Sequence, residues 1–281
     1  MIDNLFLCVG AQKAGTTWLN SQLNDHPDVG FSDVKEVHYF NTVHNASVLL
    51  TRRKVEHIKN IVNKNPGAVE RYFSNLSSGR EVDAGLHRLF SPVDDEWYIS
   101  LFKSNHKKYC ADFSPEYALI GVDGYENVKS VSKNQKIVFM MRDPVDRALS
   151  AIRYFYKMSG RDIASVSYEE LNSLANSDLI IGMSSYEKTV LDLFAVFSKH
   201  QVLFLFYEEV MGDKQGSIDK VCDFLDIEKV VLSAERMNRR VNSTEAFDIP
   251  AGIVSDIEKR LSGTYGFMKK EFEHLPSKWR C

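Results

Sequence analysis

The sequence predicts an α/β fold with a central, mostly parallel sheet flanked by helices. Three short apolar runs carry this prediction, at residues 5–9 (LFLCV), 136–141 (KIVFMM) and 201–207 (QVLFLFY). Runs of this length between charged or turn residues are typical of strands that are buried on both faces of a parallel sheet. Helical patterns separate the runs, and such alternation indicates βαβ units.

The remaining elements follow from the same patterns. Weaker strands are expected at residues 109–113 and 29–31. Helices are expected at residues 17–23, 50–63, 94–104, 144–156, 185–198 and 216–225, the fourth with Pro144 at its start, where the missing N–H costs little. Residues 158–184 and 233–250 are interpreted as loops or short helices. Neither has the character of a linker, so we expect a single domain over residues 1–281.

Composition excludes several classes of protein. The 281 residues carry 35 Lys and Arg against 38 Asp and Glu, a formal net charge of -3, which argues against a nucleic-acid binder. The four cysteines form no C-x-x-C pair, and we expect no metal site. No apolar run approaches the ~18 residues that span a bilayer, and no secretory leader precedes the first strand. We therefore expect a cytoplasmic protein without membrane insertion.

The loop after the first strand has the parts of a phosphate cradle. Gly10 and Gly15 let backbone N–H groups approach an anion, and the following helix start adds partial positive charge. Lys13 and the hydroxyls of Thr16 and Thr17 add donors. The spacing resembles a Walker A loop, but Thr16 occupies the lysine position. A P-loop kinase or hydrolase is therefore disfavoured, and the plain alternative is a βα turn with a surface lysine.

A second candidate anion site follows the strand at residues 136–141. Arg142 stands at the carboxyl end of this strand, where ligands bind in doubly wound sheets, and its planar fork suits a phosphate. Ser150 lies two helical turns further on. The alternative is a structural ion pair of Arg142 with Asp143 or Asp146. Two anion sites at two strand ends suggest a ligand with phosphate groups at both ends.

Together these motifs resemble the sulfotransferases that use 3′-phosphoadenosine 5′-phosphosulfate (PAPS). The resemblance rests on G-x-x-K-x-G-T-T-x-L and R-D-P-x-x-R-x-x-S and extends from residue 5 to about residue 225. It implies a P-loop-like fold and metal-free, in-line transfer of a sulfonate from PAPS, with 3′,5′-ADP as product. By position, the 5′ end of PAPS would lie on Lys13, Ala14, Gly15, Thr16, Thr17 and Trp18, and the 3′-phosphate on Arg142 and Ser150.

The segment 35–41 (KEVHYFN) offers an acid–base pair. Alternation along an extended segment would place Glu36 and His38 on one face. The segment resembles the E-V-H-F-F stretch of heparan sulfate sulfotransferases, which implies Glu36 as the base. His38 is the rival base, or the residue that orients the acceptor. The plain alternative is an exposed glutamate beside a structural histidine.

The match departs from those enzymes in two places. Phe113 in the segment D-F-S-P-E-Y replaces their lysine near the transferred group, so Lys13 alone, Lys103 or Arg88 would supply the cation. Their basic nucleotide-binding loop is also missing. The nearest substitute is a basic loop, which is expected to close over the nucleotide or to be a solvated loop, and which contains Arg236, Arg239, Arg240, Asn242 and Ser243.

The expected acceptor is a hydroxyl or amine of a carbohydrate or small metabolite. The loops that bind this acceptor are expected within residues 42–107 and 158–184, which contain no motif that identifies it. The basic stretches at residues 52–54 and at Lys103, Lys107 and Lys108 would either guide an anionic glycan or be solvated helix faces, and the second interpretation is favoured. A non-catalytic nucleotide-binding protein of the same fold remains the second alternative, and the oligomeric state is not predicted.

Overall fold

The computed structural model describes residues 1–32, 34–45, 47–103, 105–238 and 247–280. Five parallel strands form its sheet, in the order β2-β3-β1-β4-β5. They are β1 (Ile2–Gly10), β2 (Val29–Phe31), β3 (Tyr109–Phe113), β4 (Ser132–Met141) and β5 (Val202–Phe206). The predicted α/β architecture is confirmed, including all five strands.

Helices and 3-10 turns connect the strands. The α-helices are α1 (Thr16–Leu23), α2 (Tyr39–His44), α3 (Leu49–Lys64), α4 (Ala68–Ser77), α5 (Ala84–Phe90), α6 (Asp95–Ser100), α7 (Gly121–Val131), α8 (Pro144–Ser159), α9 (Tyr168–Ala175), α10 (Tyr186–Val196), α11 (Tyr207–Gly212), α12 (Lys214–Leu225), α13 (Ala234–Asn238) and α14 (Ala251–Glu271). The 3-10 turns are η1 (Pro115–Leu119), η2 (Ile163–Ser165), η3 (Gly182–Ser184) and η4 (Lys199–Gln201).

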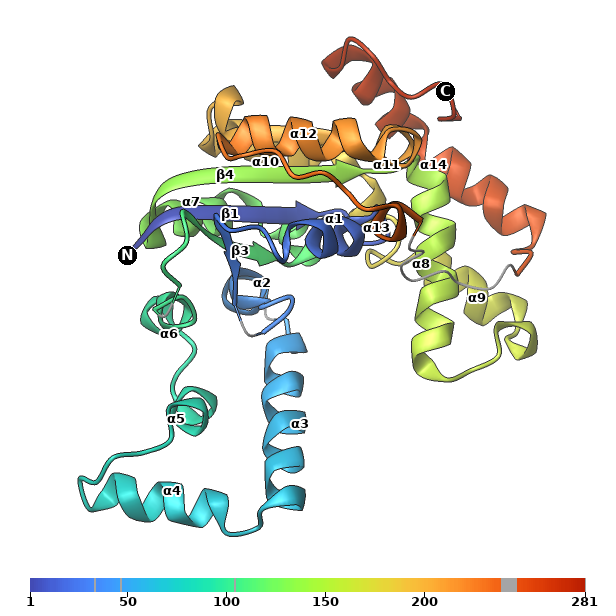
Figure 1. Ribbon diagram of the computed structural model, residues 1–281. Coiled ribbons are helices and arrows are strands. Elements are labelled where there is room, and N and C mark those ends of the chain that lie inside the picture. Colours follow the sequence, from blue (N-terminus) through green and yellow to red (C-terminus); the bar gives the residue numbers. More distant parts are fainter. Residues whose placement is uncertain (33, 46, 104, 239–246, 281) are drawn as a thin grey trace.

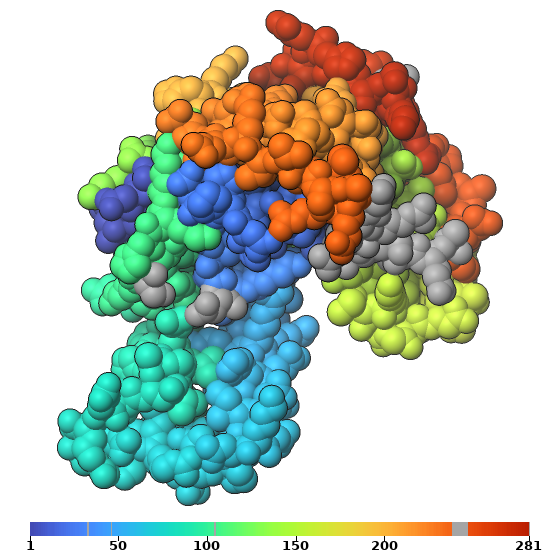
Figure 2. Space-filling model, in the orientation of Figure 1, coloured from blue at the N-terminus to red at the C-terminus, as the bar shows by residue number. Residues whose placement is uncertain are grey.

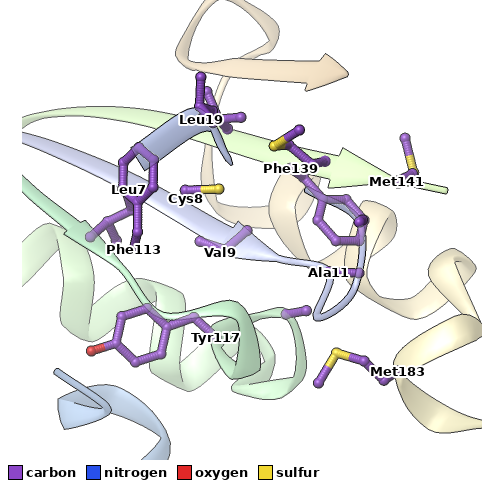
Figure 3. Packing of buried hydrophobic residues seen from close by; sticks show 14 of the residues in the cluster. Leu7, Cys8, Val9, Ala11, Leu19, Phe113, Tyr117, Phe139, Met141 and Met183 are labelled. Atoms are coloured by element: carbon purple, nitrogen blue, oxygen red, sulfur yellow. The ribbon is translucent and has the colours of Figure 1, made fainter. Parts of the chain in front are cut away.

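The core lies around the central strand β1, whose residues 5–9 are completely buried. This burial on both faces explains why the strand is a continuous apolar run instead of an alternating one. Phe113 of β3 lies in the same core, as Figure 3 shows, and packs edge-to-face against Phe6 and Phe31. Its side chain therefore serves packing.

The segment between β2 and β3 is mostly helical. Helices α3, α4 and α5 project away from the sheet as an arm, which Figures 1 and 2 show as a blue-to-teal lobe. This arm occupies much of the stretch that the sequence left as acceptor loops. Of its helices, only α3 was predicted closely, as a polar surface helix over residues 50–63.

Helix α1 follows β1, and beyond the carboxyl end of β4 helices α8, α9 and α14 pack against one another (Figure 1). Helix α8 begins where Asp143 accepts a hydrogen bond from the N–H of Asp146 (2.9 Å) and Pro144 takes the first position. Helix α14 was not predicted, although its buried residues recur at helical spacing (Ile253, Ile257, Leu261, Thr264, Met268). No helix in the described part of the chain is both long and apolar enough to cross a membrane.

Candidate active site

The loop of residues 10–15 leads from β1 into α1, as the sequence predicts. Gly15 caps the helix with a left-handed φ of 97°, a conformation that glycine adopts without strain. A Cβ added there would lie 3.1 Å from the ring of Tyr207. The tight approach of Tyr207 therefore requires glycine at this position. Ala14 and Trp18 are buried, as is Thr16 at the first helical position.

Lys13 projects from this loop into a partly buried, positively charged surrounding. Its Nζ lies 4.2 Å from the ring centroid of Tyr154 on α8. Burial, and to a lesser extent the nearby charges of Arg142, Lys157 and Arg147, together lower the pKa of Lys13 to about 8. Because this surrounding disfavours the positive charge of Lys13, a bound anion would stabilise that charge.

Arg142 follows β4 and comes close to the same loop. Its guanidinium carbon lies 4.9 Å from the ring centroid of Tyr207, the residue that also contacts Gly15. The Nε of Arg142 is buried and has no hydrogen-bond partner within the described residues. The structural ion pair considered for Arg142 is not seen there: Asp146 pairs with Arg280 at 2.7 Å instead. The structure thus brings the two predicted anion sites together around Tyr207.

Two other residues of the R-D-P-x-x-R-x-x-S motif, Arg147 and Ser150, lie on α8. Ser150 is nearly buried two turns into the helix. Arg147 is completely buried and donates to Ser184 Oγ and to the carbonyl of Ile180, both at 2.6 Å. Arg147 therefore serves the fold, and its charge reaches Lys13 only through space. Tyr207 was not predicted as a site residue, although its position directly after the last strand was a usable signal.

The Glu36–His38 segment is fixed by the end of β3. Glu36 and His38 both have left-handed backbones, with φ of 52° and 58°, which non-glycine residues rarely adopt and which cluster at functional sites. Three successive N–H groups, of residues 37, 38 and 39, donate to side chains of the D-F-S-P-E-Y segment. The acceptors are Asp112 Oδ1 (3.4 Å), Ser114 Oγ (3.2 Å) and the Tyr117 hydroxyl (2.9 Å).

Glu36 and His38 lie beside each other, as predicted. His38 Nε2 is 3.8 Å from Glu36 Oε2, and the histidine is almost completely buried. On the other side of the ring, Nδ1 lies 3.4 Å from Oε2 of Glu116, the residue after Pro115 in the β3 exit. The imidazole therefore lies between two carboxylates, of which the sequence predicted one.

Arg53 of α3 is the cation at Glu36. Its Nη2 lies 3.0 Å from Glu36 Oε2, and its Nη1 donates to the carbonyls of Lys35 and Glu36. Burial by itself would raise the pKa of Glu36, but the nearby His38, the hydrogen bond from Arg53 and the charges of Arg53 and Lys35 outweigh it and lower the pKa to about 2. The interpretation of residues 52–54 as merely solvated does not hold for Arg53.

The missing lysine is not replaced at its own position, because Phe113 faces the core. Arg236 of the basic loop pairs with Asp25 of the segment after α1. Arg239, Arg240, Asn242 and Ser243 lie outside the described residues.

Comparison with known proteins agrees with this architecture. The family model described as "Sulfotransferase domain" matches residues 3–249. Carbohydrate sulfotransferase 15 of Rattus norvegicus is 24% identical over 253 residues, covering 79% of this chain and 43% of that protein. The chain thus spans less than half the length of this curated relative.

Two solved structures show the same fold. A sulfotransferase from Alicyclobacillus acidocaldarius superposes with a TM-score of 0.66 at 19% identity and 100% coverage of both chains. The sulfotransferase domain of the Synechococcus PCC 7002 olefin synthase gives a TM-score of 0.55 at 15% identity, covering 98% of this chain and 96% of that one. The P-loop-like fold is thereby confirmed. Because the family model matches most of its length, the chain belongs to the sulfotransferase family.

Proposed function

We propose that this protein is a PAPS-dependent sulfotransferase that acts on a hydroxyl or amine of a carbohydrate or small metabolite. The observation that carries the proposal is that Gly15 and Arg142 both approach Tyr207, which brings Lys13, on the same loop as Gly15, and Arg142 into one cationic site at the ends of the neighbouring strands β1 and β4. A nucleotide with phosphates at both ends fits such a site.

The residues present fit the donor. The loop at residues 10–15 and the start of α1 offer backbone N–H groups and hydroxyls to the 5′ end, and Lys13 adds a charge. The buried, unpartnered Nε of Arg142 is available to the 3′-phosphate, with Ser150 on the following helix. When bound, PAPS supplies a sulfonyl group on a phosphate leaving group. Lys13 then stabilises the negative charge that grows on the bridging oxygen.

We assign His38, in place of Glu36, as the base that takes the proton from the acceptor hydroxyl or amine. A carboxylate with a pKa of about 2 is a weak base. The imidazole of His38 is the other candidate base, and its Nε2 lies 3.8 Å from Glu36 Oε2. The acceptor's proton moves to His38 Nε2 while the new S–O or S–N bond forms and the old S–O bond breaks. Glu36 orients the acceptor hydroxyl or amine and stabilises the imidazolium.

Binding and turnover together test the function. Calorimetric titration with 3′,5′-ADP should show saturable binding without a metal, and labelled PAPS should transfer its sulfonyl group to members of an acceptor panel. Binding of ATP with Mg²⁺ but not of 3′,5′-ADP would instead indicate a P-loop kinase or hydrolase. Donor binding without turnover on any acceptor would indicate a non-catalytic nucleotide-binding protein.

The choice of base is tested by two variants. His38→Gln should lower kcat by about a hundredfold or more, whereas Glu36→Gln should mainly raise the acceptor KM. The reverse pattern would assign the proton to Glu36.

A further inference from the structure

Glu116 connects the two halves of the candidate site. It stands on the 3-10 turn η1 directly after β3, and its side chain is mostly buried. Its Oε1 accepts a hydrogen bond from the side-chain amide of Gln12 (3.2 Å), which precedes Lys13 in the β1–α1 loop. Its Oε2 lies 3.4 Å from Nδ1 of His38.

No other group in the described part of the chain forms a hydrogen bond with the two atoms that meet between His38 and Glu116. His38 Nδ1 and Glu116 Oε2 are both fully buried and lie 3.4 Å apart, just outside hydrogen-bond geometry, and neither has a hydrogen-bond partner within the described residues. Two buried polar atoms that face each other and have no other partner are costly unless they share a proton. The geometry therefore favours an Nδ1–H that points at the carboxylate.

We propose that Glu116 is a positioning residue that fixes the ring of His38 with its proton on Nδ1, and so keeps the Nε2 lone pair toward Glu36. This inference rests on the proposed function, in which His38 accepts the proton. A carboxylate at one ring nitrogen sets the tautomer and makes the other nitrogen the acceptor. It also stabilises the imidazolium that forms when Nε2 takes a proton.

The backbone around His38 supports the same role. Its left-handed φ of 58° and its N–H bond to Ser114 fix the main chain, so Glu116 has only the ring left to orient. Through Gln12 the same carboxylate holds the loop that carries Lys13. One side chain therefore sets the spacing between the proton acceptor and the cation at the leaving group, which is a requirement for in-line transfer.

Several charged or titratable groups surround this pair. Glu36 lies on the Nε2 side with Arg53 paired to it, and Asp112 lies behind the segment on β3. Tyr154 of α8 lies within electrostatic reach of Glu36 and Glu116. Burial raises the pKa of Glu116, and the charge of His38 opposes that rise. Glu116 is thus ionised most fully when His38 is protonated, the state that the transfer creates.

The first test compares Glu116→Gln with the wild-type enzyme in PAPS turnover. The amide keeps the size but removes the charge, so kcat at neutral pH should fall by about 10- to 100-fold, while donor KM and 3′,5′-ADP affinity change by less than about twofold. The acid-side midpoint of the kcat/KM profile should move to lower pH, because the imidazolium has lost a stabilising charge. Glu116→Asp, which keeps the carboxylate, should retain the wild-type midpoint and recover part of kcat.

Glu126→Gln on α7 is the matched control, because Glu126 is half exposed and pairs only with Lys129 in the described chain. It should leave kcat and the profile unchanged. Wild-type kcat and an unmoved midpoint in Glu116→Gln would overturn the proposal.

A second measurement needs neither a variant nor turnover. Nitrogen NMR of the wild-type protein should show the neutral ring of His38 protonated on Nδ1, and protonation on Nε2 would overturn the proposal. The two ideas fail separately. Absent 3′,5′-ADP binding and absent transfer would reject the proposed function, whereas an active enzyme with the Nε2–H tautomer would reject only the role of Glu116.

Discussion

Arg53 of the projecting arm and Glu36 of the candidate site form an ion pair, with Nη2 and Oε2 3.0 Å apart. The arm therefore does more than project from the sheet, because one of its side chains helps to keep Glu36 ionised. The pair joins the arm to the segment that also holds His38.

Replacing Arg53 by Met should therefore lower stability in a pH-dependent way. The pKa of Glu36 is about 2 in the fold against an ordinary value of 4.5, so its contribution is complete above about pH 5 and is lost as the pH falls toward 2. Arg53→Met should cost about 1 kcal/mol at pH 7, and the difference from wild type should shrink on acidification. Urea unfolding at several pH values measures this, with Arg52→Met on the same helix as the control. A difference that is constant from pH 7 to pH 3 would contradict it.

Lys13 should make nucleotide binding sensitive to mild alkali. Its pKa of about 8 means that its charge is present at pH 7 and lost as the pH rises through 8, whereas phosphate groups are already fully ionised there. The affinity for 3′,5′-ADP should therefore fall between pH 7 and pH 9. Lys13→Met should weaken binding about 10- to 100-fold at pH 7, and Lys13→Arg should flatten the pH dependence.

Lys59→Met, on the exposed side of the arm, provides the baseline for these titrations. A wild-type affinity that does not change across pH 8 would remove Lys13 from the site.

Arg142 should distinguish nucleotides by their 3′-phosphate. Arg142→Ala should weaken 3′,5′-ADP binding by about 10- to 100-fold and change 5′-AMP binding by less than about twofold. Arg142→Lys should recover part of the loss, since a point charge replaces a planar fork. Calorimetry with both nucleotides makes the comparison, and Arg161→Ala, which removes a surface pair with Glu170, is the control. Equal losses for both nucleotides would mean that Arg142 does not contact the 3′-phosphate.

Tyr117 should be needed for stability around the acid–base segment. Its hydroxyl accepts from the N–H of Tyr39 (2.9 Å) and donates to the buried Asp112 (2.8 Å). Tyr117→Phe removes the hydroxyl from both partners, so the free energy of unfolding should fall by about 1–3 kcal/mol. Tyr168→Phe, on an exposed tyrosine of α9, should cost little. An unchanged urea midpoint in Tyr117→Phe would show that other groups satisfy these partners.

Replacing Phe113 by lysine, the residue that the heparan sulfate sulfotransferases have there, should lower the stability of the protein. Phe113 is buried between Phe6 and Phe31, so Phe113→Lys would bury an unpaired charge and should cost about 3 kcal/mol or more without raising turnover. Phe113→Leu should cost about 1.5 kcal/mol or less. Thermal unfolding and PAPS turnover test both, and a stable, more active lysine variant would refute this account.

The sequence was sufficient for the sheet, because residues buried on both faces leave continuous apolar runs. It also located the two candidate anion motifs, which the structure has at the ends of β1 and β4, whereas their binding roles stay predictions. Helix α5 was missed because its seven residues carry little periodic signal, whereas α4 has apolar residues at helical spacing (Val69, Tyr72, Phe73 and Leu76) and could have been found. Helix α14 had a clear apolar period and could have been found.

Arg53 and Glu116 could not be assigned from the sequence, because their roles depend on contacts between distant segments. Nothing in R-R-K or in S-P-E-Y states which carboxylate or ring lies opposite. The organisation as a single domain and the roles of Arg239 and Arg240 stay predictions.

The position of β1 at the centre of an all-parallel sheet also has a consequence for biosynthesis. Leu5 pairs with Cys110 and Leu7 with Ile137, so the buried apolar run of β1 leaves the ribosome roughly 100 residues or more before either neighbouring strand. At about 5–20 residues per second, it waits on the order of 5–25 s for a partner. During that interval its edges are open to other chains. We expect the yield of native protein to depend on chaperones that shield this strand, and to improve at low expression rates.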